Sequence, residues 1–408
     1  MSPAKILIIS SGPLCRNPRV LKEANTLGTA GYDVTVLTVA NLARFETYDT
    51  EILREAPFKK RVVDHVSIAP IARLGHFTSR FTTWLAHRGT RLGWESAHAF
   101  GPLGPLGRLA RQLPSDLIIV HTELAFCLGA QLLTEGRRVA ADFEDWHSQD
   151  LLPANRSTRP LRLLRLVEHS LLQRAAYTST TSHALAAALA GESGGKPPIV
   201  ISNSFALQPL PAPSQSVGGP ALLWFSQTIG PGRGLEPFLQ AWGQTGQTSG
   251  LSLLGDVSPE YRQELLDQLP PSHRDRLSFL PLCSPAELPV VIARHQIGLA
   301  LEPTTPANKD LTISNKILQY LNAGLVILAT GTAGQREVLA RAPAAGLEIN
   351  LGDTSVLARQ LDTLVADRPR LVEMGAAARR AAELIYSWEK EAPRLLAAVK
   401  KALATPAA

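Results

Sequence analysis

The chain has 408 residues, of which 45% are hydrophobic and 19% charged, and a formal net charge of +6. This length is too great for one ordinary hydrophobic core, so two domains are expected, and no apolar run approaches the roughly 20 residues that span a membrane. Three widely spaced cysteines form neither a disulfide framework nor a metal-binding set. The first residues lead directly into a strand, without the longer apolar region of a signal peptide, so a cytoplasmic location is expected.

Strands and helices alternate through the first half of the chain. Residues 5–10 contain an unbroken apolar run, which is typical of a central parallel strand covered on both faces. A helix follows and stops at Gly31. A basic amphipathic helix is predicted over residues 160–176. Further strands are predicted at residues 33–37, 116–121, 139–142, 177–180 and 199–201.

A basic segment rich in aromatic residues lies within this first half. From Arg54 to Arg111 the chain has ten basic residues against three acidic ones, an excess of seven. Such a segment fits an anionic membrane surface, a phosphorylated lipid acceptor or nucleic acid. The alternative is a solvated basic face whose aromatic residues belong to the core. The large apolar residues of the segment are Phe77, Phe81, Trp84, Leu85, Leu92 and Trp94.

The composition changes after Asn203. Prolines, glycines and serines crowd residues 209–220, which excludes a helix or a central strand and predicts a linker. Short βα repeats on both sides of it predict two doubly wound parallel sheets, with ligands bound in a cleft at the carboxyl ends of the strands. The expected domains are residues 1–205 and 221–385, joined by a linker over 206–220. The strands of the second domain are predicted at residues 221–225, 251–254, 277–280, 297–301 and 325–329.

The most informative segment covers residues 314–326. Ser314 is expected to cap a helix that carries Lys316 and Gln319 in its first turns and ends at Gly324. Free backbone N–H groups and the helix dipole make such a terminus an anion site. The segment resembles the "P-N-K-L-x-E-Y-M-A-A-G-K-P-V" run that holds a sugar nucleotide in family 4 glycosyltransferases. An ordinary helix–strand unit of a parallel sheet is the alternative interpretation.

This resemblance implies the GT-B fold, in which two Rossmann-like domains face each other across a cleft. The Ser-Trp-Glu run at 387–389 resembles a break after which the last helix of the family, here residues 386–408, crosses back to the first domain. The implied reaction transfers a sugar from a nucleotide diphosphate donor, with retention of configuration and without a metal. The implied acceptor is a glycan or a lipid-linked molecule, in cell-envelope or extracellular polysaccharide or glycolipid synthesis.

For the donor diphosphate, Arg233 follows a glycine-containing loop and takes the place of a lysine in the family pattern. Its planar guanidinium suits phosphate oxygens, and Lys316 would supply a second cation. The family has glutamates where this chain has Leu311 and Gln319, so Glu302 is expected to substitute in sugar recognition. Base contacts in this fold come largely from backbone groups, here expected near Leu282. The expected donor-binding residues are Gly12, Gly232, Gly234, Leu282, Glu302, Ser314, Asn315 and Gln319.

In the first domain, Arg16 and Arg19 belong to a run that resembles the "N-P-R-V-x-K-E-A" segment of similar sequences. They are expected to reach donor or acceptor phosphates, or else to pair with Glu23 or meet solvent. His121 ends a predicted strand where the family often has a histidine beside the transferred sugar, so it is expected to be catalytic together with Arg233 and Lys316.

Three carboxylates, Asp142, Glu144 and Asp145, follow the next predicted strand. Their segment resembles the acceptor-side "D-x-E-D-W-x-S" run of relatives, where carboxylates orient sugar hydroxyls or accept a proton. Structural capping and a metal site are the alternatives. No metal is expected, because these residues lack the i, i+4 spacing of helical ligands.

The sequence therefore predicts a family 4-like glycosyltransferase in the cytoplasm, in peripheral contact with the inner face of an anionic membrane and without nucleic acid as a partner. The departures at Leu311 and Gln319 leave two alternatives: a non-catalytic GT-B partner or regulatory subunit, and a sugar-nucleotide epimerase. A dehydrogenase is disfavoured because the G-x-G-x-x-G fingerprint is absent.

Overall fold

The computed structural model describes residues 2–40, 45–64, 72–152, 156–157, 159–209 and 219–405. Most of the predicted linker, residues 210–218, lies outside the described residues. The described residues form two compact units, each built on its own sheet. The first unit comprises Met1–Thr181, Leu185–Ile201 and Ala392–Ala408, and the second comprises Ser182–Ala184 and Ser202–Glu391. The end of the chain therefore belongs to the first unit.

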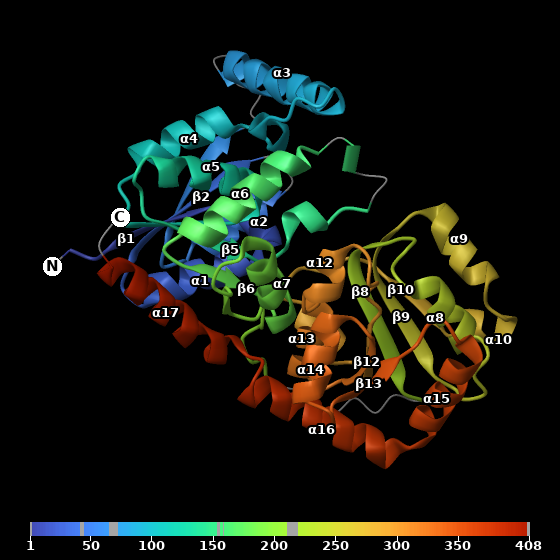
Figure 1. The fold of residues 1–408 in the computed structure, drawn as a ribbon. Helices are drawn as coiled ribbons and strands as arrows, with labels where there is room; N and C mark the ends of the chain where they lie inside the picture. The colour runs from blue at the N-terminus through green and yellow to red at the C-terminus, as the bar shows by residue number, and fades with distance from the viewer. Residues whose placement is uncertain are drawn as a thin grey trace. The chain divides into compact units, whose positions relative to one another are not determined.

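The first unit contains a seven-stranded parallel sheet in the order β3-β2-β1-β4-β5-β6-β7 (Figure 1). The residues of β1 from Ile6 to Ile9 are buried, as are all those of β4, which agrees with the unbroken apolar runs that predicted central strands. In register, Ile8 lies opposite Val36 on β2 and Ile119 on β4. The strands are β1 (Lys5–Ile9), β2 (Asp33–Ala40), β3 (Lys59–Asp64), β4 (Leu117–Val120), β5 (Val139–Phe143), β6 (Thr178–Thr180) and β7 (Ile199–Val200).

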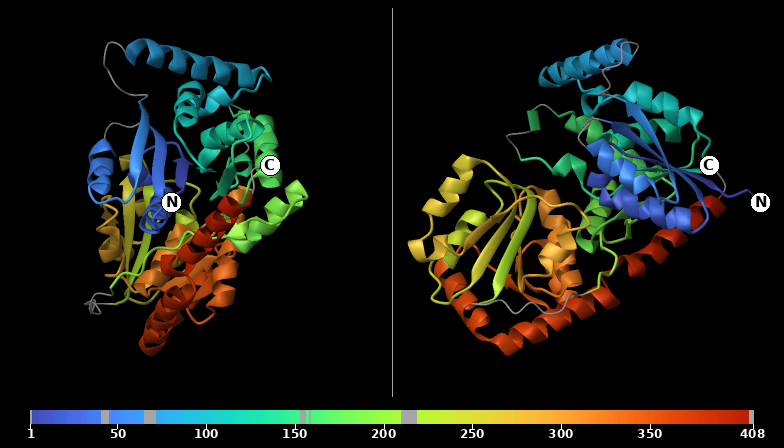
Figure 2. Two further views of the ribbon diagram at one scale, coloured as in Figure 1. Left: turned by 90° about the vertical axis from the view of Figure 1, so that its left-hand side faces the viewer. Right: turned by 180° about the vertical axis from the view of Figure 1, so that it is seen from behind.

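Helices connect these strands, and short 3-10 turns lie between them (Figure 2). The predicted basic helix over 160–176 is present as α6. The helices are α1 (Pro18–Thr29), α2 (Glu46–Leu53), α3 (Ala72–Arg91), α4 (Leu103–Gln112), α5 (Thr122–Thr134), α6 (Leu161–Arg174) and α7 (His183–Ser193). The 3-10 turns are η1 (Leu14–Arg16), η3 (Ala97–Phe100) and η4 (His147–Gln149).

The second unit contains a six-stranded parallel sheet in the order β10-β9-β8-β11-β12-β13. Its strands are β8 (Ala221–Ile229), β9 (Gly250–Val257), β10 (Leu277–Leu280), β11 (Ile297–Ala300), β12 (Val326–Thr330) and β13 (Gly346–Ile349). Its helices are α8 (Leu235–Trp242), α9 (Pro259–Asp267), α10 (Pro271–Arg274), α11 (Leu288–Ile292), α12 (Ala307–Leu311), α13 (Asn315–Ala323), α14 (Ala333–Arg341), α15 (Thr354–Ala366) and α16 (Arg368–Leu384). Helix α17 (Trp388–Ala404) ends the chain.

Two hydrophobic clusters cover the two faces of this second sheet. Neighbouring residues of one strand enter different clusters, as Trp224 and Phe225 do on β8, because side chains alternate across a sheet. Helices α8, α9 and α15 contribute to the first cluster, and α13 and α14 contribute to the second (Figure 1). Gly298 on β11 lets the ring of Tyr320 pack against the sheet, because a Cβ at this position would lie 2.3 Å from the ring.

The sequence missed one strand in each sheet. Strand β3 begins with charged residues, Lys59 and Lys60, and Glu348 interrupts the apolar residues of β13, so neither has the apolar run that marks a central strand. The last helix, α17, begins at Trp388, within the predicted segment 386–408. Within the described residues, no helix combines the length and the apolar character needed to cross a membrane.

Candidate functional site

Each sheet has one point where its strand order reverses. These points lie between β1 and β4 in the first unit and between β8 and β11 in the second. Loops at the carboxyl ends of such strand pairs are where open α/β sheets bind ligands. Many of the sequence-predicted residues lie in these loops. Gly12 follows β1, His121 follows β4, Gly232 to Gly234 follow β8, and Glu302 follows β11.

In the second unit, Lys316 and Glu302 form an ion pair. The Lys316 Nζ lies 2.6 Å from Glu302 Oε1, and the side chains are only 14% and 16% exposed. The Ser314 hydroxyl donates to the same carboxylate oxygen at 2.9 Å. Burial raises the pKa of Glu302, but the Lys316 ammonium, together with Lys309 and the Ser314 hydroxyl, outweighs burial and holds this pKa at about 2. The carboxylate is therefore ionised at neutral pH and fixes the ammonium at the start of α13.

Helix α13 begins and ends where the sequence predicts. Its N-cap is Ser314, whose side chain accepts from the Lys316 N–H, and Gly324 follows it in the left-handed conformation with φ of 70°. Asn315 accepts a hydrogen bond at 3.0 Å from the side chain of Asn203, and Gln319 is partly buried. Lys316 also lies 5.5 Å from the ring centroid of Trp224. The backbone N–H groups of this terminus and the Lys316 cation thus lie together, as a phosphate site requires.

A buried chain of hydrogen bonds supports Glu302 from the neighbouring strand. The Thr330 hydroxyl, at the end of β12, donates to the Glu302 carbonyl at 2.6 Å. The Gln335 amide donates to the Thr330 carbonyl at 2.8 Å, and Gln335 is fully buried. Sequence reasoning missed both residues. Their only sequence signal is a polar residue at the end of an apolar strand and another in the first turn of the next helix.

The loop between β8 and α8 holds Arg233. Its Nη1 donates to the Ser226 hydroxyl at 2.9 Å in an exposed position. Gly232 and Gly234 both have positive φ, at 73° and 76°. A Cβ at Gly234 would lie 3.0 Å from Leu301 Cβ, whereas a Cβ at Gly232 would meet open space. Gly234 is therefore needed for packing and chain direction irrespective of any ligand.

Leu282 lies apart from these residues in the sheet order. It follows β10, the edge strand, and β9 lies between this strand and β8. Its side chain is 45% exposed. A role for Leu282 in donor binding stays a prediction.

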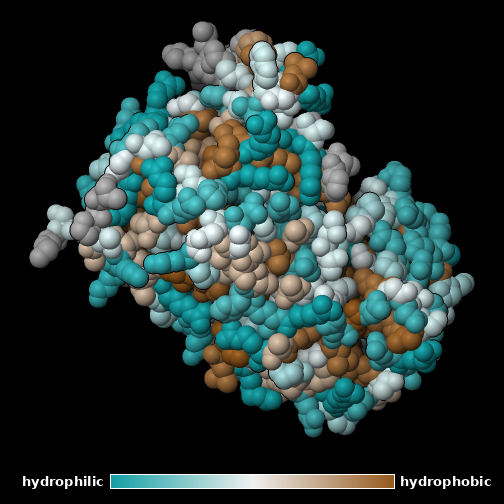
Figure 3. Space-filling model, in the orientation of Figure 1, coloured by the Kyte–Doolittle hydropathy of each residue, from teal (hydrophilic) through white to brown (hydrophobic). Residues whose placement is uncertain are grey.

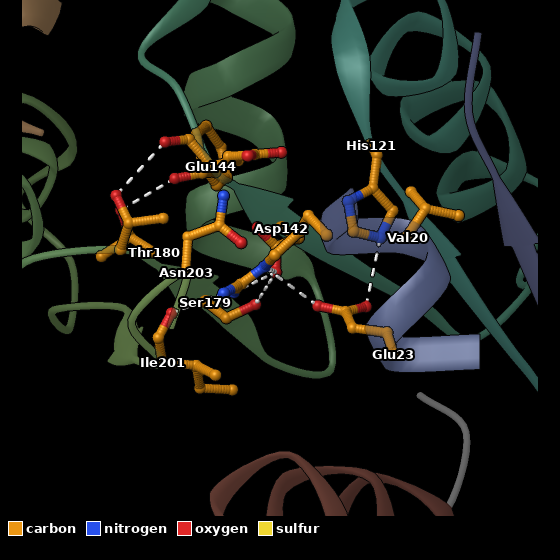
Figure 4. A network of polar contacts seen from close by, with 12 residues as sticks. Val20, Glu23, His121, Asp142, Glu144, Ser179, Thr180, Ile201 and Asn203 are labelled. Carbon is orange, nitrogen blue, oxygen red and sulfur yellow. Dashed lines mark hydrogen bonds and ion pairs between the residues drawn. The ribbon is translucent and has the colours of Figure 1, made fainter. Parts of the chain in front are cut away.

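In the first unit, Arg19 belongs to a buried polar network. Figure 4 shows Glu23, His121, Asp142 and Ser179 of this network. The Arg19 guanidinium is fully buried and donates to Asp142 Oδ2 through Nη2 at 2.6 Å and to the Ile201 carbonyl through Nη1 at 2.6 Å. The Nε lies 3.3 Å from Glu23 Oε1, one turn along α1. The Ser179 hydroxyl also donates to Asp142 Oδ2, at 3.0 Å. Arg19 thereby ties α1 to β5 and to the residue after β7.

This network bears on the expectation that Arg19 and Asp142 contact the acceptor. Their charged groups are bonded to each other and 0% and 1% exposed, so both hold this unit together, and a role in acceptor binding stays a prediction. Of the alternatives left open by the sequence, the pairing of Arg19 with Glu23 is present. Arg16 is exposed instead, with its guanidinium 5.2 Å from the ring centroid of Phe45.

His121 faces the same network from the end of β4. Its Nε2 lies 3.2 Å from Glu23 Oε2, and its ring is 2% exposed (Figure 4). Burial lowers the pKa of His121, but Glu23 and Asp142 together outweigh this effect and raise it above the ordinary value. The next residue, Thr122, has a φ of 68°, which is rare for a β-branched residue, and its hydroxyl accepts from Ser11 at 3.1 Å. The switch point of this sheet is therefore held together by side chains of both its loops.

Glu144 and Asp145 lie just beyond β5 and are partly buried. Burial and the neighbouring Asp145 carboxylate raise the pKa of Glu144 to about 7. Burial and the Arg19 cation lower the pKa of Lys22 to about 7. Lys22 was not among the predicted residues. Its sequence signal is its position three residues after Arg19 on the same helix. Glu144 thus has the pKa of a proton acceptor at neutral pH.

Among the described residues, Glu23, His121 and Asp142 have ligand atoms within 4.8 Å of one another, close enough to share a metal ion. The Arg19 guanidinium, however, lies 3.3 Å from Glu23 and 2.6 Å from Asp142. A cation placed among these carboxylates would meet this fixed positive charge, so the donor set does not suit a metal.

Solved structures identify the class of fold. No protein-family model matches the chain, and no curated protein sequence matches it. Similar structures include HepE of Anabaena, solved with UDP and with UDP-glucose, at a TM-score of 0.68 and 16% identity over 97% of this chain and 99% of that one. The sucrose-phosphate synthase of Thermosynechococcus elongatus has a TM-score of 0.67 and 14% identity over 98% of both chains.

A third similar structure is a protein of Listeria monocytogenes that has been assigned as a UDP-N-acetylglucosamine 2-epimerase. It has a TM-score of 0.61 and 13% identity over 100% of this chain and 99% of that one. These likenesses cover nearly the whole chain and define a GT-B fold, which confirms the predicted fold class.

Proposed function

We propose that this protein is a glycosyltransferase that takes a sugar from a nucleotide diphosphate donor. The observation that carries the proposal is the Lys316–Glu302–Ser314 cluster, which places a fixed ammonium at the N-terminus of α13 beside the β8/β11 switch point. A leaving diphosphate develops negative charge, and a fixed cation with preorganised N–H donors stabilises such charge. Arg233 would add a second cation from the β8–α8 loop, with Gly232 allowing close approach of the backbone.

The finer assignment follows the resemblance of the sequence to family 4. It comprises hexosyl transfer with retention of configuration to a glycan or lipid-linked acceptor, in polysaccharide or glycolipid synthesis, at the cytoplasmic face of a membrane. HepE, whose structures contain UDP and UDP-glucose, supports UDP as the first nucleotide to test.

In the first unit, we propose that Gly12, His121 and Arg16 serve the donor and acceptor from the loops around the β1/β4 switch point. Glu144 suits the role of proton acceptor, because its pKa lies near 7. Asp145, through its charge, keeps that pKa high. Arg19 and Asp142 would act indirectly, since Arg19 holds Glu23 and Glu23 holds His121.

A sugar-nucleotide epimerase is the second candidate. The observation that favours it is the likeness to the Listeria epimerase over the whole chain. Such an enzyme acts on the donor sugar without an acceptor. Incubation with UDP-sugars alone, followed by separation of the products, distinguishes the two candidates, because only the epimerase converts one UDP-sugar into another.

Thermal unfolding with UDP, GDP, dTDP, ADP and CMP tests the proposal. A ligand at 100 times its dissociation constant adds about 2.7 kcal/mol to the free energy of unfolding, which is visible as a shift in melting temperature. We expect one diphosphate to shift the wild type and to lose this shift in Lys316→Met. Arg294→Ala is the matched control, because Arg294 is an exposed cation of the same unit. If all five nucleotides leave melting unchanged, the protein is a non-catalytic GT-B partner.

A further inference from the structure

On the described part of helix α3, small residues face the unit and large apolar residues face outward. On its described side chains, the residues that face the unit are small: Ala86 is 8% exposed, and Thr83 and Thr90 are partly buried. The outward residues are large and apolar: Phe81 is 50% exposed and Trp84 is 48% exposed. A surface helix of a globular protein normally places its apolar stripe toward the core. This helix instead presents that stripe to the surroundings, and Leu85 extends it at 53% exposed.

The turn after α3 extends the apolar surface. Leu92 and Trp94 are 78% and 79% exposed, the highest values among the large apolar residues described. Gly93 has a φ of 84° and reverses the chain, so that the Trp94 N–H donates to the Gly89 carbonyl at 2.8 Å. A Cβ at Gly89 would lie 3.2 Å from the Trp94 carbonyl oxygen. The backbone thus holds Trp94 in its exposed position.

Positive charge flanks these apolar residues. Arg80, Arg88 and Arg91 are exposed, and residues 72–94 contain no aspartate or glutamate. The guanidinium of Arg88 lies 4.5 Å from the ring centroid of Trp84. The next acidic residue, Glu95, accepts hydrogen bonds from the backbone N–H groups of Arg162 and Leu163 at the start of α6.

Cationic and apolar groups therefore share one surface without a balancing acid on the same segment. In Figure 3, hydrophobic and hydrophilic residues lie side by side over α3. We name this the α3 surface, formed by Arg80, Phe81, Trp84, Leu85, Arg88, Arg91, Leu92 and Trp94.

We propose that the α3 surface binds an anionic lipid bilayer, with α3 lying along the interface. Exposed apolar residues in a contiguous group mark an interaction site. Tryptophans favour the boundary between headgroups and acyl chains, and arginines beside them bind anionic headgroups. Nucleic acid would engage the arginines but leave Leu85 and Leu92 in water. A second copy of this chain would have to place its own three arginines against these three.

Membrane binding by the α3 surface does not depend on the proposed reaction. A transferase with a soluble acceptor would need no such surface, and a protein without transferase activity could still bind a membrane. Membrane binding by the α3 surface would support a lipid-linked acceptor, because such an acceptor lies at the membrane interface.

Co-sedimentation of the full chain with vesicles tests the proposal. We expect binding to vesicles of phosphatidylcholine with one third phosphatidylglycerol at low salt, weak binding to pure phosphatidylcholine, and loss of binding in 0.5 M salt. Replacing Arg80, Arg88 and Arg91 by glutamine should weaken binding about fivefold per arginine, since each cation near an anionic surface contributes about 1 kcal/mol. The double variant Trp84→Ser/Trp94→Ser should weaken it at least about tenfold.

Matched variants control for lost charge and lost hydrophobicity. Glutamine at the exposed Arg359, Arg368 and Arg370 removes the same charge from the second unit, and Val372→Ser/Leu384→Ser removes apolar residues that are 73% and 70% exposed. All these variants should melt like the wild type. Equal vesicle binding by the α3 variants and their controls would overturn the proposal. Self-association in the absence of vesicles that is lost in Trp84→Ser/Trp94→Ser would also overturn it. Binding to RNA without binding to vesicles would do the same.

Discussion

The Lys316 ammonium and the Glu302 carboxylate, 2.6 Å apart, join the start of α13 to the residues that follow β11. In the family pattern that the sequence resembles, glutamates occupy the positions of Leu311 and Gln319. Here Leu311 ends α12, and its carbonyl accepts from the Ser182 hydroxyl at 2.6 Å. The carboxylate near the lysine therefore comes from another part of the chain. It fixes the Lys316 ammonium at the start of α13.

The first prediction concerns the stability that Glu302 supplies. The folded protein holds its pKa at about 2, below the ordinary 4.5, so its contribution is fully present above pH 4.5 and is lost as pH falls through about 2. Glu302→Gln should lower the free energy of unfolding by about 3 kcal/mol at pH 7. Urea unfolding at pH 7, 5 and 3 should show a constant difference between pH 7 and 5 and a smaller one at pH 3.

The control for this measurement is Glu264→Gln, which changes an exposed carboxylate of α9 in the same unit. Its unfolding free energy should stay within about 0.5 kcal/mol of the wild type at each pH. A pH-independent loss in Glu302→Gln would mean that packing, and not the ion pair, accounts for the effect.

The second prediction separates two arginines that stand three residues apart. Arg19→Met leaves the buried Asp142 carboxylate without its partner, which typically costs about 3–5 kcal/mol. Arg16→Met changes an exposed side chain, so about 0.5 kcal/mol or less is expected. Denaturant unfolding of both variants measures the difference. Equal losses would show that the Arg19 network does not stabilise the unit.

These two arginines also show what the sequence can and cannot predict. Arg19 occupies the arginine position of the quoted motif and Arg16 stands just before it, but neither position shows by itself which side chain is buried. Arg19 is buried because its position on α1 faces β5, which lies more than 100 residues away in the chain. Arg16 belongs to η1 and is exposed. Burial of a charge depends on tertiary contacts, so the sequence could not predict which arginine is structural.

Features with a local cause were predicted correctly. The cap at Ser314 and the stop at Gly324 need only side chains within α13 and its flanks, and both are confirmed. The central strands were predicted from their apolar runs. Strand β3 was missed because its residues are largely charged, and the sequence does not show that it pairs with β2. The pairing of Glu302 with Lys316 spans 14 residues, and the sequence indicated only that Glu302 could substitute for a missing glutamate.

The third prediction concerns the protonation of His121. Burial lowers its pKa, and Glu23 and Asp142 together raise it by more than burial and Arg19 lower it, so the net direction is upward from 6.5. The protonated form therefore stabilises the folded protein, fully below pH 6.5 and progressively less as pH rises through the folded pKa. In Glu23→Gln the pKa of His121 should fall, because the variant removes the carboxylate that raises it most. Asp142 is then the acidic neighbour that still raises this pKa, and burial and Arg19 continue to lower it.

Histidine-selective NMR titration measures this change. His273, in the second unit, is the internal control, and its pKa should be the same in both proteins. A pKa of His121 that stays constant in Glu23→Gln would show that this carboxylate does not hold the ring, and that the 3.2 Å approach has no electrostatic consequence.

The last prediction concerns Arg233, whose guanidinium is held by the Ser226 hydroxyl at 2.9 Å in an exposed loop. If Arg233 stabilises the charge of the leaving diphosphate, Arg233→Ala should reduce turnover at least ~100-fold, since a lost transition-state contact costs about 2.7–4 kcal/mol. The free energy of unfolding should change little, because this side chain has no buried partner among the contacts described. Arg233→Lys should retain part of the activity, because lysine keeps the charge but not the planar fork.

Steady-state kinetics with the diphosphate sugar identified by thermal unfolding would measure these effects. Arg294→Ala, which removes another exposed cation of the second unit, should keep wild-type turnover. Ser226→Ala removes only the hydroxyl that orients Arg233, so a smaller loss, about tenfold or less, is expected from misplacement of the guanidinium. Wild-type turnover in Arg233→Ala would remove Arg233 from the mechanism and leave Lys316 as the cation for the diphosphate.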